Sequence, residues 1–143
     1  MLGKILLAVD GSEPAQKAVD WAIDAYRALP AAQFHILYVF EPFVPVGDIG
    51  GYIPTDFRIE SMLEIPEDTP SYLAFQQFPD KQRVTHETLV GNPANVICEE
   101  ARKGKFDVIV VGSEGHGAVA SVLLGSVSAK LLHNAPCSVL VVR

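Results

Sequence analysis

The chain has 143 residues, of which 49% are hydrophobic and 20% are charged, a composition that is typical of a folded globular protein and excludes a disordered one. This length is enough for a buried core, and we expect residues 1–143 to form a single domain. The formal net charge of −6, with no basic stripe along the chain, argues against a nucleic-acid partner.

The sequence predicts neither membrane insertion nor secretion. No apolar run reaches the length of a transmembrane helix, so we expect no membrane contact. The short apolar start of the chain runs directly into Asp10 without a small-residue cleavage site, which favours a strand over a signal peptide. Cys98 and Cys137 lack the spacing of metal ligands, and we expect both to be buried thiols in the cytoplasm.

The chain begins with a pattern of strand, polar turn, helix and second strand. The continuous apolar run over 5–9 is typical of a strand buried on both faces in a parallel sheet. Ser12 is a suitable N-cap and Pro14 is tolerated in a first helical turn, so we expect a helix that ends at Pro30. The run over 34–40 predicts the second strand.

The connection over about 42–80 is irregular and rich in proline and glycine. A proline inside a helix costs about 3 kcal/mol, so no long helix fits this connection. Short helices over 57–65 and 71–78 are its best candidates for regular structure. A connection of this length is compatible with a lid or interaction loop and equally with a partly disordered insert, and the sequence leaves both alternatives open.

The second half of the chain repeats the alternation of strands and helices. Strands are expected over 83–90, 107–111 and 138–142. One helix begins at Asn92-Pro93 and is followed by Gly104 in the C′ position. Another helix begins near Val127 and stops at Asn134.

This order of elements predicts an α/β fold, a three-layer sandwich with a five-stranded parallel sheet of the Rossmann-like type. In such sheets ligands bind beyond the carboxyl ends of the strands, at the point where the strand order reverses. Asp10 follows the first strand and Gly112 follows the fourth, so we expect both residues at that edge.

A spaced set of glycines follows the fourth strand. Gly112 and Gly115 precede Gly125-Ser126, with nine residues between the second and third glycines. Glycine permits a positive φ and the close approach of another group, and the amides of a helix N-terminus attract anions. We therefore expect this loop to bind a phosphate group.

This glycine spacing, together with the Val-Asp-Gly-Ser sequence at 9–12, resembles the ATP-binding branch of the universal stress protein family. The family pattern of Gly, two residues, Gly, nine residues, Gly and then Ser or Thr is matched without a gap by Gly112, Gly115, Gly125 and Ser126. The sequences over 91–94 and 136–142 are also similar to the family, and only residues 41–82 fall outside the match. The resemblance implies the adenine nucleotide alpha hydrolase-like fold and a stress-response or regulatory protein that binds ATP, ADP or AMP.

The resemblance also implies which residues contact the nucleotide. They are Asp10, Val39, Gly112, Gly115, Gly125, Ser126 and Val127. Asp10 would lie beside the adenine or the sugar, and Val39 would offer its backbone N–H and C=O to the adenine edge. Gly112 would lie against the ribose and Gly115 against the phosphates. The last three residues would close on the phosphates through backbone amides and the Ser126 hydroxyl.

Three further expectations come with the resemblance. ATP would carry Mg²⁺ or Mn²⁺ held through its phosphates, with no separate metal site in the protein. Glu114 is acidic where members of the family often carry a basic or neutral residue, so the choice among ATP, ADP and AMP stays open. A homodimer is implied through the last strand, over 138–142, which is apolar and expected at the edge of the sheet.

Other interpretations use the same residues. Gly115-His116-Gly117 begins a dinucleotide fingerprint, but NAD binding requires an acidic residue about 20 positions further, and the chain has no Asp or Glu after Glu114. Asp10 could be an ordinary strand-end residue that caps the following turn. A serine nucleophile would need a general base, which the sequence does not indicate, so we expect at most slow ATP hydrolysis. The alternative function is a nucleotide-free protein-interaction module of the same fold.

Overall fold

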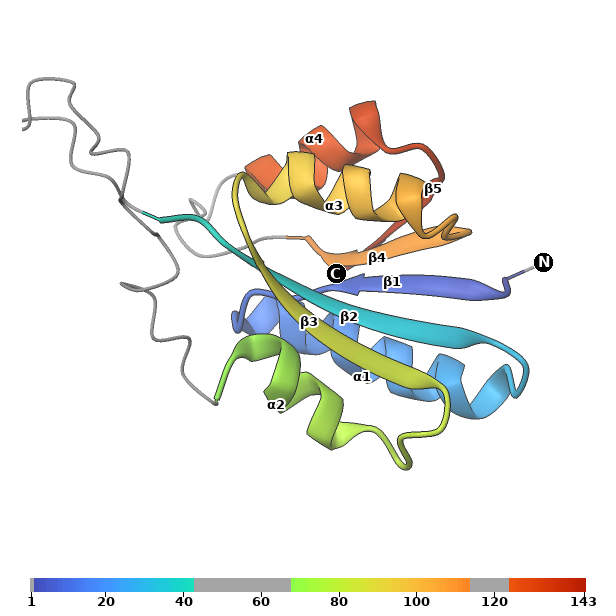
Figure 1. Ribbon diagram of the computed structural model, residues 1–143. Helices are drawn as coiled ribbons and strands as arrows, with labels where there is room; N and C mark the ends of the chain where they lie inside the picture. Colours follow the sequence, from blue (N-terminus) through green and yellow to red (C-terminus); the bar gives the residue numbers. More distant parts are fainter. Residues whose placement is uncertain (1, 43–67, 114–123) are drawn as a thin grey trace, which may run out of the picture.

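Five parallel strands form one sheet in the part of the chain that the structure describes (Figure 1). The structure is a computed structural model and describes residues 2–42, 68–113 and 124–143. In spatial order the strands are β3 (Val84–Val90), β2 (Gln33–Phe40), β1 (Lys4–Ala8), β4 (Val108–Gly112) and β5 (Ser138–Val142). All neighbouring strands pair in parallel, and β5 lies at one edge. The predicted parallel sheet is therefore confirmed.

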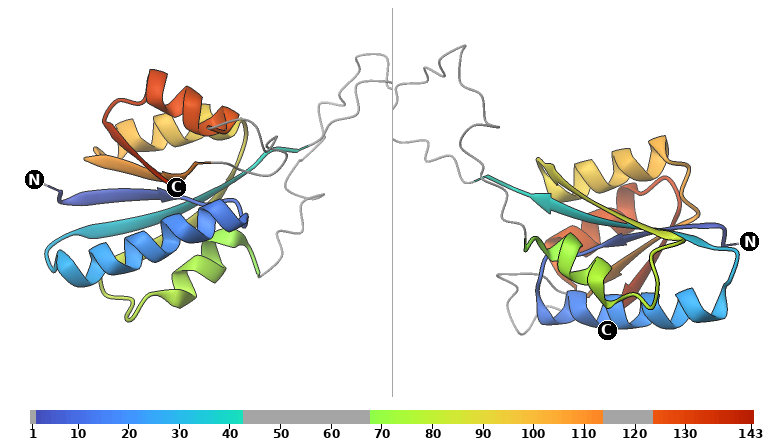
Figure 2. Two further views of the ribbon diagram at one scale, coloured as in Figure 1. Left: turned by 180° about the vertical axis from the view of Figure 1, so that it is seen from behind. Right: turned by 60° about the horizontal axis from the view of Figure 1, so that its bottom comes forward.

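Helices cover both faces of the sheet, and the views of Figures 1 and 2 agree on the layers. One face carries α1 (Glu13–Ala28) and α2 (Pro70–Gln77), and the other carries α3 (Pro93–Lys103) and α4 (Ser126–Asn134). This arrangement confirms the three-layer α/β sandwich. None of the helices in the described ranges has the length and apolar character needed to cross a membrane.

The two faces of β1 build two separate cores, because successive side chains of a strand point to opposite faces. Ile5 and Leu7 pack in the core beneath α1, and Leu6 and Ala8 pack in the core beneath α3. Ile5, Leu6 and Leu7 are fully buried. The continuous apolar run at the start of the chain is thus explained by a central strand that is covered on both sides.

Three of the described helices begin with a capping side chain followed by a proline. The caps are Ser12 for α1, Thr69 for α2 and Asn92 for α3. Each cap accepts a hydrogen bond from the backbone amide three residues further on, which satisfies a donor that the helix itself leaves unpaired. The predicted starts at Ser12 and Asn92 are confirmed. The predicted helix over 71–78 corresponds to α2, and the helix predicted over 57–65 lies outside the described residues.

The end of α3 differs from the prediction by one residue. Gly104 is the C-cap and has a right-handed conformation with φ of −80°, whereas Lys105 takes the left-handed conformation with φ of 52°. Glycine is favoured at 104 for another reason, since a Cβ there would collide with the ring of Phe106. The sequence pattern located the end of the helix but assigned the left-handed C′ position to the wrong residue.

The two cysteines are free thiols in the described structure. Cys98 is buried in α3, as predicted. The prediction of a buried Cys137 is wrong in degree, because this residue is only half-buried. It immediately precedes β5, and an edge strand is less completely covered than a central one.

Candidate functional site

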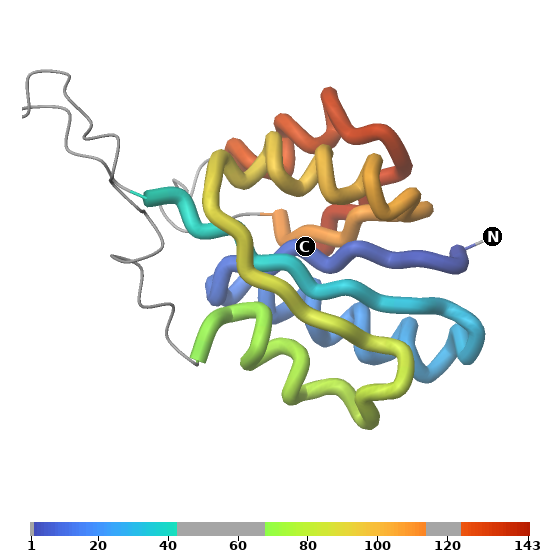
Figure 3. The backbone as a smooth tube through the Cα atoms, in the orientation of Figure 1, coloured from blue at the N-terminus to red at the C-terminus, as the bar shows by residue number. Residues whose placement is uncertain are grey.

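The candidate site lies at the carboxyl edge of the sheet, between β1 and β4. Leu7 of β1 pairs with Val110 of β4, and three positions further along each segment come Asp10 and Ser113. The strand order reverses here, because β2 and β3 continue the sheet from β1 while β5 continues it from β4. Open α/β sheets bind ligands at such a switch point. The backbone trace in Figure 3 shows the path of the chain through this edge.

Asp10 organises the turn that leads from β1 into α1. Its Oδ1 atom accepts hydrogen bonds from the Ser12 amide at 2.9 Å and from the Ser12 hydroxyl at 2.5 Å. Gly11, between the two, has a left-handed φ of 80°, a conformation that favours glycine. These bonds establish the turn-capping role, which is the simpler of the two interpretations of Asp10, and its contact with a nucleotide stays a prediction.

Tyr38 of β2 is a neighbour of Asp10 that the sequence reasoning missed. Burial raises the pKa of the Tyr38 phenol above its ordinary value, and the negative charge of Asp10 raises it further. The phenol is therefore a neutral hydroxyl group at physiological pH. Its position immediately before Val39, near the end of the second strand, is the signal that could have identified it.

Val39 turns its main chain, and not its side chain, toward the site. Its side chain is buried in the core beneath α3 and α4. The carbonyl of Leu37 accepts from the amide of Val9 at 3.0 Å, so the peptide groups of Leu37 face β1. Peptide groups alternate in direction along a strand, which points the N–H and C=O of Val39 to the same side, beyond the end of β1. This direction is compatible with the predicted contact between the Val39 backbone and the adenine.

Gly112 is the point at which the end of β4 meets the first turn of α1. A Cβ at this position would lie 2.6 Å from the carbonyl carbon and oxygen of Pro14 and 2.9 Å from the amide nitrogen of Ala15. Real Cβ atoms do not approach backbone atoms so closely, so only glycine fits here. The predicted contact of Gly112 with the ribose stays a prediction, whereas its packing against α1 is directly observed.

The first turn of α4 is joined to the end of β4. The Gly125 amide donates a hydrogen bond to the Ser113 carbonyl at 2.7 Å. Gly125 is the N-cap of α4, and because glycine has no side chain it makes no capping bond to the first turn that follows. Ser126 is exposed and Val127 is half-buried. This helix start thus presents backbone amides without a capping side chain, which is the chemistry that an anion requires.

The start of α2 lies beside the same edge, which the sequence did not predict. A Cβ at Gly11 would lie 3.4 Å from Cγ of Pro70, the first residue of α2. The buried Ser71 hydroxyl shares hydrogen bonds with Thr69 at 3.1 Å and with Thr88 of β3 at 2.9 Å. The N-termini of α1, α2 and α4 therefore converge around Gly11 and Gly112. The Thr-Pro pair at 69–70 is the sequence signal for this helix start, but it lies within the connection that is rich in proline and glycine.

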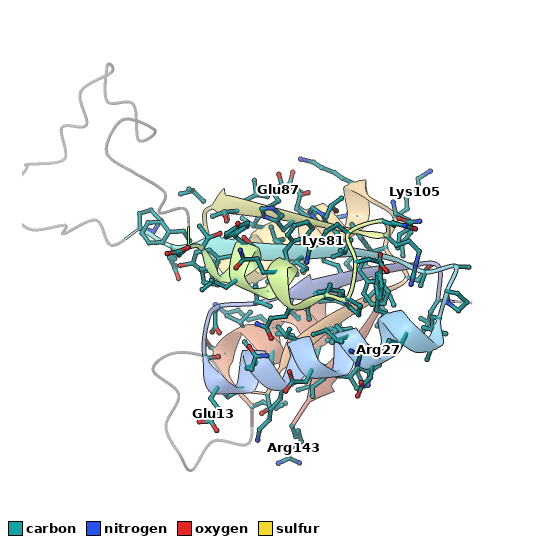
Figure 4. All side chains as sticks on the ribbon, turned by 90° about the horizontal axis from the view of Figure 1, so that it is seen from below. Glu13, Arg27, Lys81, Glu87, Lys105 and Arg143 are labelled. Atoms are coloured by element: carbon teal, nitrogen blue, oxygen red, sulfur yellow. The ribbon has the colours of Figure 1, made fainter. Side chains whose placement is uncertain are left out.

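These helix starts differ in charge. Glu13 lies in the first turn of α1, and Figure 4 shows it at the carboxyl edge, whereas Arg27 and Lys105 lie at the opposite end of the sheet. An acidic residue in the first turn partly neutralises the positive end of the helix dipole. The first turn of α4 contains no acidic residue, so this end attracts an anion more strongly than the start of α1 does.

Part of the predicted site lies outside the described residues. Gly115 and Glu114 belong to the segment 114–123, and most of the irregular connection belongs to the segment 43–67. The structure brings together Asp10, Gly112 and the Gly125–Val127 turn, with the main chain of Val39 directed to the same edge.

The similarity to known proteins extends over the whole chain. The model of the universal stress protein family matches residues 1–143. A universal stress protein of Thermus aquaticus is 37% identical over 146 residues, and the alignment covers 100% of both chains.

Solved structures share the fold. Universal stress protein UspA from Lactobacillus plantarum has a TM-score of 0.73 and 25% identity, with 99% of this chain and 98% of that chain covered. A universal stress protein in complex with cAMP has a TM-score of 0.68 and 25% identity, with 99% and 97% covered. A universal stress protein family protein from Arabidopsis thaliana with AMP bound has a TM-score of 0.63 and 21% identity, with 98% and 90% covered.

Proposed function

The chain belongs to the universal stress protein family, and on this premise we propose that it binds an adenine nucleotide at the sheet edge between β1 and β4. Binding serves a stress-response or regulatory role, and the protein catalyses at most slow ATP hydrolysis. The observation that carries the proposal is the convergence of the N-termini of α1, α2 and α4 at this edge, with a glycine, which has no capping side chain, at the N-cap of α4.

The structural neighbours support an adenine nucleotide over other anions. One of these proteins is in complex with cAMP and another has AMP bound. Both ligands combine an adenine base with a phosphate, and the edge described above offers a partner for each part. The α4 start suits the phosphate, and the main chain of Val39 suits the adenine edge.

In this proposal, each predicted residue contacts a particular part of the nucleotide. Backbone amides of Ser126 and Val127, with the Gly125 turn, bind the phosphates, and Gly115 contributes from the loop before them. Asp10 and Gly112 lie beside the sugar. One contact supports this division: the Gly125–Ser113 hydrogen bond of 2.7 Å joins the α4 start to the end of β4.

The nucleotide and its cation are also part of the proposal. We infer that ATP, ADP or AMP binds, with Mg²⁺ or Mn²⁺ held mainly through the phosphates and water. Such a cation supplies positive charge that offsets the negative charge of the phosphates. Backbone amides carry only partial positive charge and offset less of it. Glu114 lies in the same loop as Gly115, so its carboxylate is the group that distinguishes a triphosphate from a monophosphate.

The proposal extends to a cytoplasmic homodimer. β5 is an edge strand of the described sheet, and an edge strand offers unpaired peptide groups to a second copy of the chain. A two-fold contact through β5 would use the same surface on both copies. The free thiols of Cys98 and Cys137 are compatible with a reducing compartment.

Mass spectrometry of the ligand retained on native purification tests the proposal. We expect a mass corresponding to AMP, ADP or ATP, and an increase in the melting temperature when that nucleotide is added to the emptied protein. The alternative, a nucleotide-free protein-interaction module, predicts no retained nucleotide and no shift in melting temperature. That result would replace the proposed function with the alternative.

A further inference from the structure

Ser128 is a buried polar residue for which the proposed site has so far given no role. It is the third residue of α4, and its side chain is only 2% exposed. Its hydroxyl donates a hydrogen bond to the Gly112 carbonyl at 2.9 Å, with the Ser113 carbonyl 3.4 Å away. The hydroxyl thus connects α4 to the end of β4, because its acceptor is the backbone of Gly112, the first of the spaced glycines.

Hydrogen bonds at two points therefore connect α4 to the end of β4. The Gly125 amide bonds to the Ser113 carbonyl at the entry to the helix, and the Ser128 hydroxyl bonds to the Gly112 carbonyl one turn later. Two bonds at separate points along the helix fix its orientation as well as its distance from the strand. The remaining packing of α4 rests on apolar side chains such as Leu131, and apolar contacts are not directional.

We propose that Ser128 is a positioning residue for the phosphates of the bound nucleotide, an inference that rests on the proposed function. Its hydroxyl fixes the first turn of α4 relative to β4, so that the amides of Ser126 and Val127 point at the phosphate groups. Ser128 itself does not touch the ligand, because it is buried on the side of the helix that faces β4.

If Ser128 positions the phosphate-binding amides, its removal should weaken binding of phosphate-bearing ligands only. If Ser128 merely stabilises the fold, its removal should not change the affinity for ADP relative to adenosine. When the hydroxyl is removed, the helix start shifts relative to β4, and hydrogen bonds from its amides to the phosphate become longer or bent. The adenine and sugar contacts come from β1, β2 and β4. Gly112 loses its bond from Ser128 but keeps its place, because β4 pairs with β1 on one side and with β5 on the other. Affinity for ADP should fall about tenfold, as expected for the loss of one hydrogen bond to a charged group, whereas affinity for adenosine should stay the same.

The experiment is calorimetric titration of the full chain with adenosine and with ADP and Mg²⁺, comparing the wild type with Ser128→Ala and Ser128→Thr. Ser128→Thr retains the hydroxyl and should retain the wild-type ratio of the two affinities. Ile97→Val serves as the control for weakened packing. Ile97 is 3% exposed and lies in the same core as Leu131 of α4, and its side chain cannot form a hydrogen bond. The substitution should lower stability without changing the ratio.

The outcomes distinguish the inference from the proposed function. An unchanged ratio in a folded Ser128→Ala variant overturns the positioning role while leaving nucleotide binding intact. A wild-type protein that binds neither ligand overturns the proposed function and the inference with it. If Ser128→Ala does not fold, Ser128→Cys replaces it, because a thiol is a weak donor and should give a ratio between those of wild type and full loss. A wild-type ratio in that variant contradicts the inference.

Discussion

Gly112 and Pro14 are in direct backbone contact, although 98 positions separate them in the sequence. A Cβ on Gly112 would lie 2.6 Å from the carbonyl carbon and oxygen of Pro14. The contact brings the end of β4 against the first turn of α1, and Ser128 bonds to the carbonyl of the same glycine from α4. One glycine thus fixes the relative positions of two helix N-termini that we assign to the nucleotide site.

Gly112→Ala should destabilise the protein by about 1–3 kcal/mol, because the added methyl group must displace backbone atoms of α1 rather than a movable side chain. Urea unfolding measures this change. Gly3→Ala is the matched control, since a Cβ at Gly3 would meet only Asp107 Oδ2, at an ordinary contact distance of 3.4 Å. Equal stabilities for the two variants would contradict the close packing at Gly112.

Asp107 should make the stability depend on pH in the acid range. Hydrogen bonds from the backbone amides of Lys4 and Gly3, each 2.8 Å long, lower the pKa of the Asp107 carboxyl below its ordinary value. The unfolded chain therefore binds the proton more readily than the folded one. This stabilisation is fully present above the unfolded-state pKa of about 4 and is lost as the pH falls through the lower folded-state pKa.

The test for Asp107 compares wild type with Asp107→Asn in urea unfolding from pH 6 down to about pH 3. The variant should be less stable at pH 6, and the difference should shrink as the pH falls. Asp24→Asn is the control, because Asp24 forms only an exposed ion pair with Arg27. A constant difference between wild type and Asp107→Asn at every pH would contradict the assignment.

Arg83 should not be replaceable by lysine. Its guanidinium donates hydrogen bonds to the carbonyls of Leu29 at 3.0 Å, Ala32 at 2.7 Å and Tyr26 at 2.8 Å. It also lies 3.8 Å from the centre of the Tyr26 ring. An ammonium group has neither the planar shape nor the reach for all these partners.

Arg83→Lys should lower the free energy of unfolding by about 1–3 kcal/mol, because carbonyls at the end of α1 lose their donors. The control is Arg27→Lys, since Arg27 is an exposed helix residue whose pairing with Asp24 is worth little. Chemical unfolding of both variants provides the comparison. A loss at Arg83 no larger than the loss at Arg27 would show that the end of α1 does not depend on the guanidinium.

Val141 provides a test of the homodimer that leaves the sheet intact. The Val142 carbonyl accepts a hydrogen bond from the Ser113 amide, so the peptide groups of Val142 face β4 and those of Val141 face outward. Val141→Pro removes one outward N–H and should convert a dimer of twice 15.5 kDa into a monomer in sedimentation equilibrium. Val141→Ala keeps the N–H and should remain dimeric. A wild-type mass of 15.5 kDa would contradict the proposed assembly.

The order of strands and helices could be predicted because it depends on local patterns. The apolar run before Asp10 and the capping residues Ser12 and Asn92 lie within a few positions of the elements that they define. The edge position of β5 was predicted from its apolar run at the end of the sequence, and the strand order confirms it. Patterns of this kind are repeated along the chain, so a sequence reveals them without knowledge of distant contacts.

The details of the site could not be predicted because they depend on contacts between distant residues. Nothing near Gly11 in the sequence indicates that Pro70 lies beside it, and nothing near Ser128 indicates a bond to Gly112. The same holds for Tyr38, which feels the charge of Asp10 because β2 lies beside β1 in the sheet. The glycine spacing predicted a phosphate loop, but only the fold shows that Gly112 packs against α1 and that the Gly125 amide bonds to the Ser113 carbonyl.

Calorimetric titration with ATP, ADP and AMP in the presence of Mg²⁺ tests the central claim most directly. At least one nucleotide should bind to the wild-type protein with a dissociation constant far below the millimolar range. The double variant Gly115→Val, Gly125→Val should lose this binding while keeping its circular dichroism spectrum, because both changes crowd the phosphate loop. Absent or millimolar binding of all three nucleotides to the wild type would contradict the claim that this edge of the sheet is an adenine-nucleotide site.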